Sequence, residues 1–273
     1  MTPKVILLTG ASSGIGFNTA KMLAEQGHKV YGAARRIEKI EPLAPLGVVA
    51  IKMDVTDQAS MEAGVKQVIA AEGHIDVLVN NAGYGYFGAI ETVSMEDARR
   101  QLEVNVFGLA ALTRLVLPYM RERRSGRIIN IASVAGKTVF QFGGWYHVSK
   151  YSVEALSDAL RIEMKAFGVD VCIIEPGIIK TDWGIIAADH LEESSRGTAY
   201  EKAANGQAAM MRKIYTGNFN SDPTVISRAI SHAVNSRRPR TRYTTGLGSH
   251  AAVFFHWLLP DRWWDALMRR LLK

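Results

Sequence analysis

The stretch KVILLTGASSGIG, residues 4–16, joins a short apolar run to a glycine-rich turn. The apolar run at residues 4–9 predicts a buried strand, and helically spaced apolar residues at 14–26 predict a helix directly after the turn. Glycines at this junction let the backbone approach a pyrophosphate, which rests on the helix N-terminus. The spacing G-x-x-x-G-x-G also occurs in purely structural turns. Its place between strand and helix favours a dinucleotide-binding site, to which the hydroxyls of Ser12 and Ser13 add phosphate ligands.

Working outward from this stretch, strands and helices alternate along the chain. Apolar runs predict further strands at residues 29–34, 48–53, 76–79, 127–132 and 169–174. Helical spacing predicts helices at residues 57–71, 94–124, 145–167 and 222–235, the second capped by Ser94. Nearly continuous apolar strands between helices are typical of a parallel sheet covered on both faces. We therefore expect an α/β fold with one doubly wound (Rossmann) sheet of about seven strands.

No linker divides the chain, so residues 1–273 are interpreted as a single domain. Residues 181–215 show weak periodicity, which favours a mobile substrate lid. Residues 248–273 are rich in aromatics and predict two short helices broken at Pro260. The aromatic and basic residues of this tail suit packing within the protein, a membrane-surface helix or a subunit contact, and we favour packing.

Composition narrows the class of protein. With 48% hydrophobic and 22% charged residues, the chain is typical of a soluble globular protein, not of a disordered or fibrous one. Its net charge is +7, but the basic residues are scattered in small groups, which argues against nucleic-acid binding. The lone Cys172 lies in an apolar run and no metal-ligand spacing occurs, so we expect a buried thiol and no metal site. With no signal peptide or membrane-spanning run, the expected location is cytoplasmic.

The end of the second predicted strand indicates which cofactor is bound. Enzymes that use NAD usually place an acidic residue there to bind the ribose 2′-hydroxyl. This chain has Ala34 followed by Arg35 and Arg36. A guanidinium binds a phosphate in bidentate fashion, so the pair favours NADP(H) over NAD(H).

Tyr146 and Lys150 are four residues apart, which places them on one face of a helix. A tyrosine that acts as an acid or base near neutrality needs its pKa lowered from about 10, roughly 3 to 4 kcal/mol of differential stabilisation. A nearby ammonium and an oxidised nicotinamide supply it. Such a pair is common by chance, but Ser133 ends the fifth strand and other polar or glycine motifs, Asn80 to Gly83 and Pro176-Gly177, end neighbouring strands. The carboxyl ends of these strands face one ligand crevice.

Together these motifs resemble the short-chain dehydrogenase/reductase family, over about residues 4–182 and more weakly through the helix after Asp222. The tail is similar to that of its hydroxysteroid, retinol and acyl-dihydroxyacetone-phosphate reductase branch. The resemblance implies that Tyr146 is the acid/base, that Lys150 binds the nicotinamide ribose and lowers the tyrosine pKa, and that Ser133 polarises the substrate oxygen. It also implies that Asn105 holds a water of a proton relay. Asp54 and Val55 would contact adenine, Asn80 and Gly83 would line the adenosine side, and Ile179 and Thr181 would bind the carboxamide.

The predicted cofactor site extends over several strand ends. Its residues are Gly10, Ser12, Ser13, Gly14, Ile15, Gly16, Arg35, Arg36, Asp54, Val55, Asn81, Ala82, Gly83, Tyr146, Lys150, Pro176, Gly177, Ile179 and Thr181. The predicted substrate pocket is almost wholly apolar, which indicates a hydrophobic ketone, aldehyde or secondary alcohol. Its residues are Val134, Phe140, Phe142, Gly143, Trp145, Ile178 and Trp183. The resemblance further implies a homodimer or homotetramer formed through the helices that contain Asn105 and Tyr146.

Two alternatives stay open from sequence alone. One is an NAD-dependent alcohol dehydrogenase that uses the same site. The other is a non-catalytic NADP(H)-binding regulator, against which the intact set of Ser133, Tyr146 and Lys150 argues.

Overall fold

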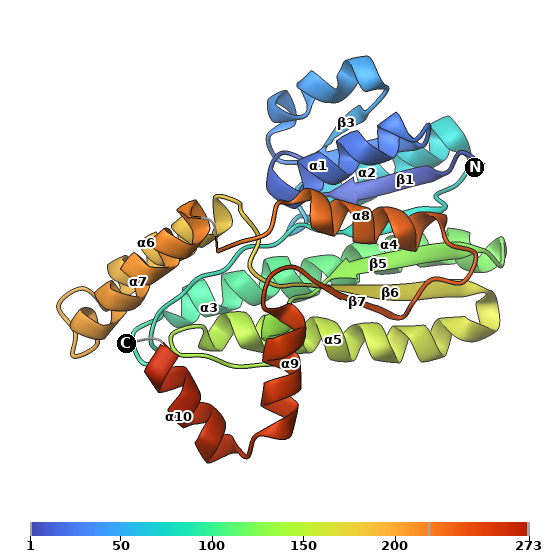
Figure 1. The fold of residues 1–273 in the computed structure, drawn as a ribbon. Helices are drawn as coiled ribbons and strands as arrows, with labels where there is room; N and C mark the ends of the chain where they lie inside the picture. The colour runs from blue at the N-terminus through green and yellow to red at the C-terminus, as the bar shows by residue number, and fades with distance from the viewer. Residues whose placement is uncertain (1, 218, 272–273) are drawn as a thin grey trace.

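Seven parallel strands form one central sheet in the computed structural model, which describes residues 2–217 and 219–271 (Figure 1). The strands are β1 (Val5–Thr9), β2 (Lys29–Ala34), β3 (Val49–Lys52), β4 (Val77–Asn80), β5 (Gly126–Ile131), β6 (Val169–Pro176) and β7 (Arg242–Thr245). Their order is β3-β2-β1-β4-β5-β6-β7, so the chain winds outward from β1 in one direction, returns to β4 and winds in the other. The doubly wound α/β fold is thus confirmed, and its switch point between β1 and β4 is where such sheets bind ligands.

Helices cover both faces of the sheet (Figure 1). On one face α1 (Gly14–Glu25) and α8 (Thr224–Asn235) pack on residues such as Leu8 and Val79. On the other face lie α2 (Gln58–Glu72), α4 (Leu109–Glu122) and α5 (Gly144–Met164), packed on Leu7 and Ile128. Strands buried on both sides explain why their sequences read as continuous apolar runs. Cys172 is 1% exposed on β6, and burial raises its pKa to about 12, as expected of a structural thiol.

The helix predicted over residues 94–124 contains an irregular turn. Ser94 caps α3 (Met95–Leu102), its Oγ accepting from the Asp97 amide at 3.0 Å, and Glu103–Gly108 then winds as a π-helix before α4 begins. The wide turn presses Gly108 onto the backbone of Val55, where a Cβ would lie 2.4 Å from the carbonyl oxygen. The whole rod, Met95–Glu122, has the length and hydropathy of a membrane span, but its apolar face packs on the sheet as a core helix does.

The segment predicted as a weakly structured lid forms two helices, α6 (Trp183–Ser195) and α7 (Glu201–Thr216). They pack together beyond the carboxyl ends of the strands (Figure 1), with Ala187, Ala188, Ala204 and Ala208 fully buried. Small alanines let the two helices approach closely while contributing little to an apolar stripe. The weak periodicity therefore concealed two regular helices, which are stabilised by each other, and the role of the segment as a substrate lid stays a prediction.

The C-terminal region contributes an edge strand and a helical hairpin. Arg242 of β7 forms ion pairs with Glu154 at 3.1 Å and Asp158 at 2.5 Å, both on α5, so a polar strand is held at the sheet edge. Beyond it α9 (Ser249–Leu258) and α10 (Asp261–Leu271) are separated at Pro260, as predicted.

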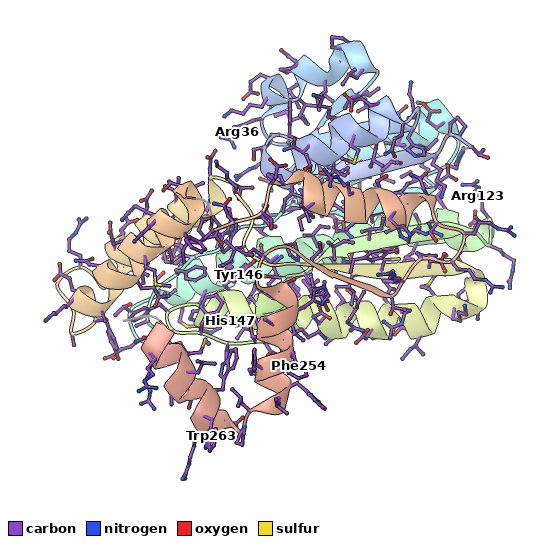
Figure 2. The ribbon with its side chains drawn as sticks, viewed as in Figure 1. Arg36, Arg123, Tyr146, His147, Phe254 and Trp263 are labelled. Carbon is purple, nitrogen blue, oxygen red and sulfur yellow. The ribbon has the colours of Figure 1, made fainter. Side chains whose placement is uncertain are left out.

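The aromatic residues of this hairpin divide between two environments. Trp264 is 5% exposed and donates from Nε1 to the carbonyl of Val139 at 3.0 Å. Phe254, Trp257 and Trp263 are 52%, 79% and 68% exposed, and Figure 2 shows Phe254 and Trp263 on the hairpin, at the opposite end of the fold from Arg36. Packing within the protein therefore accounts for only part of the aromatic content of the tail.

Candidate active site

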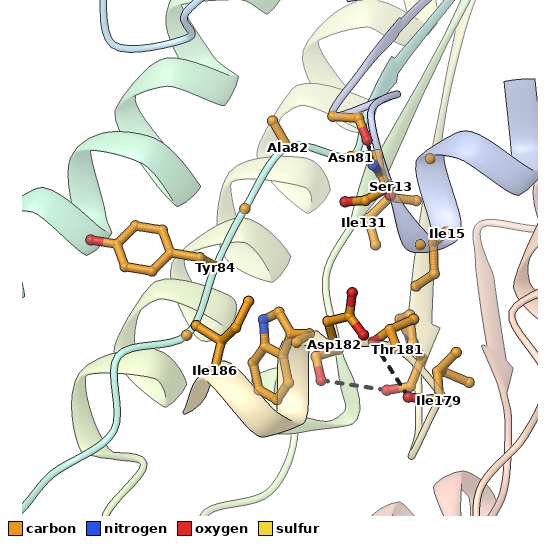
Figure 3. Close-up of a pocket in the computed structure, with 18 of the residues that line it drawn as sticks. Ser13, Ile15, Asn81, Ala82, Tyr84, Ile131, Ile179, Thr181, Asp182 and Ile186 are labelled. Carbon is orange, nitrogen blue, oxygen red and sulfur yellow. Dashed lines mark hydrogen bonds between the residues drawn. The ribbon is translucent and has the colours of Figure 1, made fainter. Parts of the chain in front are cut away.

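A cavity of about 1200 Å³ runs along the carboxyl edge of the sheet and under α6 and α7. It runs from the glycine turn at one end, past Tyr146, to a group of aromatic side chains at the other. Most of the predicted site residues line it: Gly10, Ser12, Ser13, Gly14, Ile15, Gly16, Arg35, Arg36, Asp54, Val55, Asn81, Ala82, Gly83, Ser133, Val134, Phe140, Tyr146, Lys150, Pro176, Gly177, Ile178, Ile179, Thr181 and Trp183. Figure 3 shows Ser13 and Asn81 facing Ile179 and Thr181 across this space.

Three predicted substrate residues, Phe142, Gly143 and Trp145, are not among those that line the cavity. At Phe142 the backbone has a φ of 61°, and its carbonyl accepts from the Gly88 amide at 2.9 Å. This bend turns the Phe142 ring away from the cavity and into contact with Tyr200. The predicted place of these three residues in the cavity wall is therefore not observed, and for Phe142 the left-handed backbone accounts for the direction of the ring.

Asn80, expected to line the adenosine side of the cofactor site, is also not among the residues that line the cavity. Asn80 is 3% exposed, and its Nδ2 donates to Thr113 Oγ1 at 3.0 Å and to Asn130 Oδ1 at 2.9 Å. It joins β4, β5 and α4 beneath the cavity. The next residue, Asn81, lines the cavity instead, because successive residues of a strand point to opposite sides.

The glycine turn is shaped by close backbone approaches. Gly10 and Gly14 have φ values of 68° and 52°, which side chains rarely adopt, and a Cβ on Gly16 would lie 2.2 Å from the carbonyl oxygen of Gly10. Thr9 Oγ1 accepts from the amides of Asn81 and Ala82, each at 3.0 Å, and so ties this turn to the end of β4. The turn leaves the N-terminus of α1, which has no acidic residue in its first turn, open to an anion.

Positive charge lies where β2 meets the cavity. Arg35 and Arg36 are exposed and line it, and Lys39, which the sequence analysis did not single out, lies beside them. A sharp glycine turn, an open helix N-terminus and a cationic rim at one end of a long cavity fit a phosphorylated dinucleotide. The residues present therefore match the cofactor that the motif predicts.

Ser133, Tyr146 and Lys150 converge at the middle of the cavity. All three are buried, Tyr146 hydrogen-bonds Ser133, and Lys150 Nζ lies 5.8 Å from the centroid of the tyrosine ring. Ser133 reaches this point because it ends β5, and the other two because α5 begins beside that strand end. A hydroxyl pair that can address one oxygen atom, next to an ammonium, is an arrangement suited to proton transfer.

Burial controls the acidity of this group. It raises the pKa of Tyr146 to about 12, while the hydrogen bond with Ser133 acts in the opposite direction. It lowers the pKa of Lys150 to about 8, against the attraction of Glu154 one helical turn away. The phenol is therefore neutral at physiological pH, and the lowered tyrosine pKa expected from the sequence is not found in this structure.

Asn105 lies beside the cavity and not in its lining. It is 1% exposed in the π-helical turn, where Oδ1 accepts from the Tyr84 amide at 3.0 Å and Nδ2 donates to the Tyr84 carbonyl and to Ser149 Oγ. A Cβ on Gly83 would lie 3.0 Å from Asn105 Oδ1 and 3.8 Å from Lys150 Nζ, so the two side chains meet at that glycine. The relay water expected at Asn105 stays a prediction, since three hydrogen bonds of this side chain already join it to Tyr84 and Ser149.

Aromatic rings surround the Tyr146 end of the cavity. The Tyr146 ring centroid is 5.7 Å from that of Phe87 and 5.0 Å from that of Trp183, and Phe87 is 6.0 Å from Phe140. Tyr215 packs against Trp183 from behind, with centroids 6.2 Å apart. Of these rings, Phe87 and Tyr215 were not predicted. Both rings lie on segments that only the tertiary fold brings to the site.

One face of α7 also lines the cavity and was missed. Its residues recur at helical spacing: Gln207, Met210, Met211 and Ile214. That spacing was readable in the sequence, but the assignment of the segment to a mobile lid hid it.

With this geometry established, comparisons with known proteins identify the family. The family model described as short chain dehydrogenase matches residues 4–190. A probable short-chain type dehydrogenase/reductase, VdlC, of Helicobacter pylori is 34% identical over 263 residues, 96% of each chain. A 3-ketodihydrosphingosine reductase of Bacteroides thetaiotaomicron is 44% identical over 182 residues, 66% of each chain, and retinol dehydrogenase 16 of Rattus norvegicus is 33% identical over 89% of this chain and 80% of its own.

Solved structures agree. A short-chain dehydrogenase from Streptomyces avermitilis superposes with a TM-score of 0.80 at 33% identity, over 99% of this chain and 95% of that one. A serine dehydrogenase complexed with NADP+ superposes with a TM-score of 0.74 at 28% identity, over 89% and 94%. The protein therefore belongs to the short-chain dehydrogenase/reductase family, as the motifs predicted, and is an oxidoreductase with a site for a nicotinamide cofactor.

Proposed function

We propose that this protein is an NADP(H)-dependent reductase of apolar ketones or aldehydes, and that Tyr146 donates the proton. The observation that carries the proposal is the continuous cavity, with a cationic rim at Arg35 and Arg36, buried Ser133, Tyr146 and Lys150 in the middle, and aromatic walls beyond. A buried acid/base group beside an apolar pocket of this size suits a bulky, water-poor substrate.

The roles of the residues follow from their chemistry. Ile179 and Tyr146, which line the cavity, would hold the nicotinamide end of the cofactor, whose chemistry when bound would be hydride transfer. Tyr146, whose pKa burial raises to about 12, keeps its proton at neutral pH and can donate it to the substrate oxygen. Ser133 holds that oxygen by a second hydrogen bond, and Lys150 adds positive charge near the developing negative charge. Alcohol oxidation uses the same residues in reverse.

Cofactor preference is proposed from charge. The two arginines at the end of β2 attract a 2′-phosphate, and the residue directly after Ala34 is Arg35 and not an acidic residue that would bind a 2′-hydroxyl. The serine dehydrogenase structure named above was solved with NADP+, in line with this choice. The names of the two relatives that act on retinol and 3-ketodihydrosphingosine support an apolar substrate.

A screen of ketones and aldehydes with NADPH and NADH tests the proposal. We expect turnover of apolar ketones with NADPH, and a loss of about 10² to 10⁴-fold in kcat for Tyr146→Phe. Tyr31→Phe is the matched control, because it also removes a buried phenol hydroxyl, one that bonds Glu72 far from the cavity. Tighter binding of NADH than NADPH, or full activity of Tyr146→Phe, would contradict the assignment. No turnover with any carbonyl compound would favour a cofactor-binding regulator.

The protein is further proposed to form a homodimer or homotetramer through α4, α5 and the turn before α4. Exposed apolar side chains lie on these elements: Phe107, Tyr119, Val148, Tyr151 and Ile162. Association would remove them from water. Light scattering on the purified protein checks the mass, and a monomer at micromolar concentration would contradict this proposal.

A further inference from the structure

One polar side chain stands out in the apolar end of the cavity. Gln207 lies on the face of α7 that lines the cavity with Met210, Met211 and Ile214, yet it is 3% exposed. Its Oε1 has no hydrogen-bond partner among the described residues. A buried carbonyl oxygen without a partner is unfavourable, so a glutamine at this point of an apolar face needs another explanation than packing.

The orientation of the amide is fixed by its neighbour. Nε2 lies 3.0 Å from the backbone carbonyl of Gln141, which can only accept a hydrogen bond. The amide nitrogen must therefore face Gln141, and the oxygen is the atom left free. The unused atom is an acceptor, so the group it could bind is a donor.

The free oxygen is separate from the groups that serve the reacting carbonyl. Tyr146 and Ser133 serve the oxygen that gains the proton, and the ring of Phe87 packs on both Tyr146 and Phe140. Gln207 donates to the carbonyl of Gln141, the residue after Phe140, so it is joined to the Phe140 side of this aromatic group. A ligand that fills the cavity would thus place a second polar group, other than its carbonyl, at Gln207.

We propose that Gln207 is a specificity-determining residue whose Oε1 accepts a hydrogen bond from a hydroxyl or amino group of the substrate. The substrate class is then an apolar ketone or aldehyde that carries a separate hydrogen-bond donor. This inference rests on the proposed reductase function and narrows its substrate.

The test compares a long-chain methyl ketone with chain-hydroxylated and chain-aminated derivatives of the same length, at several positions of the added group. With NADPH and the wild-type protein, we expect at least one derivative to exceed the parent ketone by about tenfold in kcat/KM, the effect of one hydrogen bond. The gain should appear mainly in KM, because the contact is the same in ground and transition states. The position that gains reports the distance from Tyr146 to Gln207, and the two series separate a hydroxyl from an amine.

Variants then locate the effect. Gln207→Met keeps the volume but removes the acceptor, so the ratio of kcat/KM for the favoured derivative to that for the parent ketone should fall from about ten to about one. Ser195→Ala is the control, since Ser195 is also fully buried with an unpartnered oxygen in the described structure but does not line the cavity. It should keep the preference. Melting temperatures of all three proteins show that they fold.

The outcomes are distinct. Equal kcat/KM for the parent ketone and every derivative, or a preference that survives in Gln207→Met, would overturn the role of Gln207 and leave the reductase function intact. If no ketone is reduced, both proposals fail together. Equal kcat/KM values for the wild-type protein overturn the role of Gln207 even if Gln207→Met does not fold.

Discussion

Lys150 donates a hydrogen bond from Nζ to the backbone carbonyl of Ile131 at 2.8 Å. The ammonium is thus anchored to the end of β5 and stays 5.8 Å from the centroid of the Tyr146 ring. Anchoring to a neutral carbonyl leaves the charge of Lys150 uncompensated apart from Glu154, and this explains why burial dominates its pKa. The first prediction follows from that relationship.

In the cofactor-free protein, Lys150 should titrate near pH 8. Because folding disfavours its charged form, its contribution to the free energy of unfolding increases as the pH rises from about 8 toward the unfolded value of 10.5. NMR of isotope-labelled lysine side chains measures the titration, and Lys150→Arg identifies the signal. A midpoint at the ordinary lysine value would show that the ammonium is solvated and that the buried position is wrong.

Replacing Arg35 and Arg36 together by serine should weaken NADPH binding by about 10- to 100-fold, because each loses a charge-assisted contact with the phosphate. NADH binding should change by less than about threefold, since NADH lacks that group. Fluorescence titration of both cofactors gives the two ratios. Arg123→Ser is the control, an arginine paired with Asp76 at the other end of the sheet (Figure 2). An equal loss of affinity for NADPH and NADH would contradict the assignment of Arg35 and Arg36 to the 2′-phosphate.

His147 should make the protein sensitive to acid. Its Nε2 accepts from the Phe140 amide at 3.1 Å, so Nδ1 carries the proton and donates to the carbonyl of Ala135 at 2.9 Å. Burial lowers its pKa below 6.5, and protonation would break the contact with Phe140.

Because the unfolded chain binds this proton more readily, the free energy of unfolding should fall as the pH drops below about 6.5. Urea unfolding at neutral and mildly acidic pH measures the loss, which His147→Gln should reduce. His74→Gln is the control, because His74 is a partly exposed histidine that pairs with Asp76. This variant should keep most of the loss in the free energy of unfolding. An unchanged acid loss in His147→Gln would count against the neutral tautomer.

Trp264→Phe should destabilise the protein by about 1 kcal/mol and raise KM for carbonyl substrates. The change removes the hydrogen bond to the Val139 carbonyl while keeping an aromatic ring in place. Val139 precedes Phe140, so the wall of the cavity would loosen although α10 itself does not line it. Thermal unfolding and steady-state kinetics check the two effects. Trp263→Phe, on the exposed side of α10, should change neither.

Two glycine substitutions should have opposite effects. Gly206→Ala lies in α7 where an added Cβ meets nothing within 4 Å, so it should raise the free energy of unfolding by about 0.5 to 1 kcal/mol. Gly16→Ala brings Cβ to 2.2 Å from the carbonyl oxygen of Gly10, so it should distort the turn and abolish cofactor binding. Chemical unfolding and cofactor titration measure the pair. Normal NADPH binding by Gly16→Ala would show that the turn has more room than its geometry indicates.

The sequence predicted the central fold and the middle of the site because those signals are local. Continuous apolar strands, the glycine turn and Ser133, Tyr146 and Lys150 at strand or helix ends each depend on a few adjacent residues. The sequence failed to predict the elements that depend on contacts between distant parts of the chain. Strand β7 has no apolar run, and it is held at the edge by ion pairs of Arg242 with residues more than eighty positions away. Helices α6 and α7 bury alanines against each other, which leaves little periodicity to read.

The substrate end shows the same limit. Phe142 was placed in the pocket from its position near Tyr146, but a single backbone angle turned it away. Gln207 was overlooked because a glutamine in a polar segment signals nothing until its surroundings are known. Only the packing of α7 over the cavity reveals that its oxygen is unused.

The π-helical turn at Glu103–Gly108 changes the direction in which side chains point along the helical segment Met95–Glu122. Asn105, within the turn, holds Tyr84 beside the site, and Thr113, after the turn, meets Asn80 of the sheet. If the same residues wound as a regular α-helix, one half would be rotated against the other by about 100°. Either Asn105 or Thr113 would then point away from its partner. The winding of this turn is therefore as tightly constrained as the identity of its residues, whereas α10 at the surface is under no such constraint.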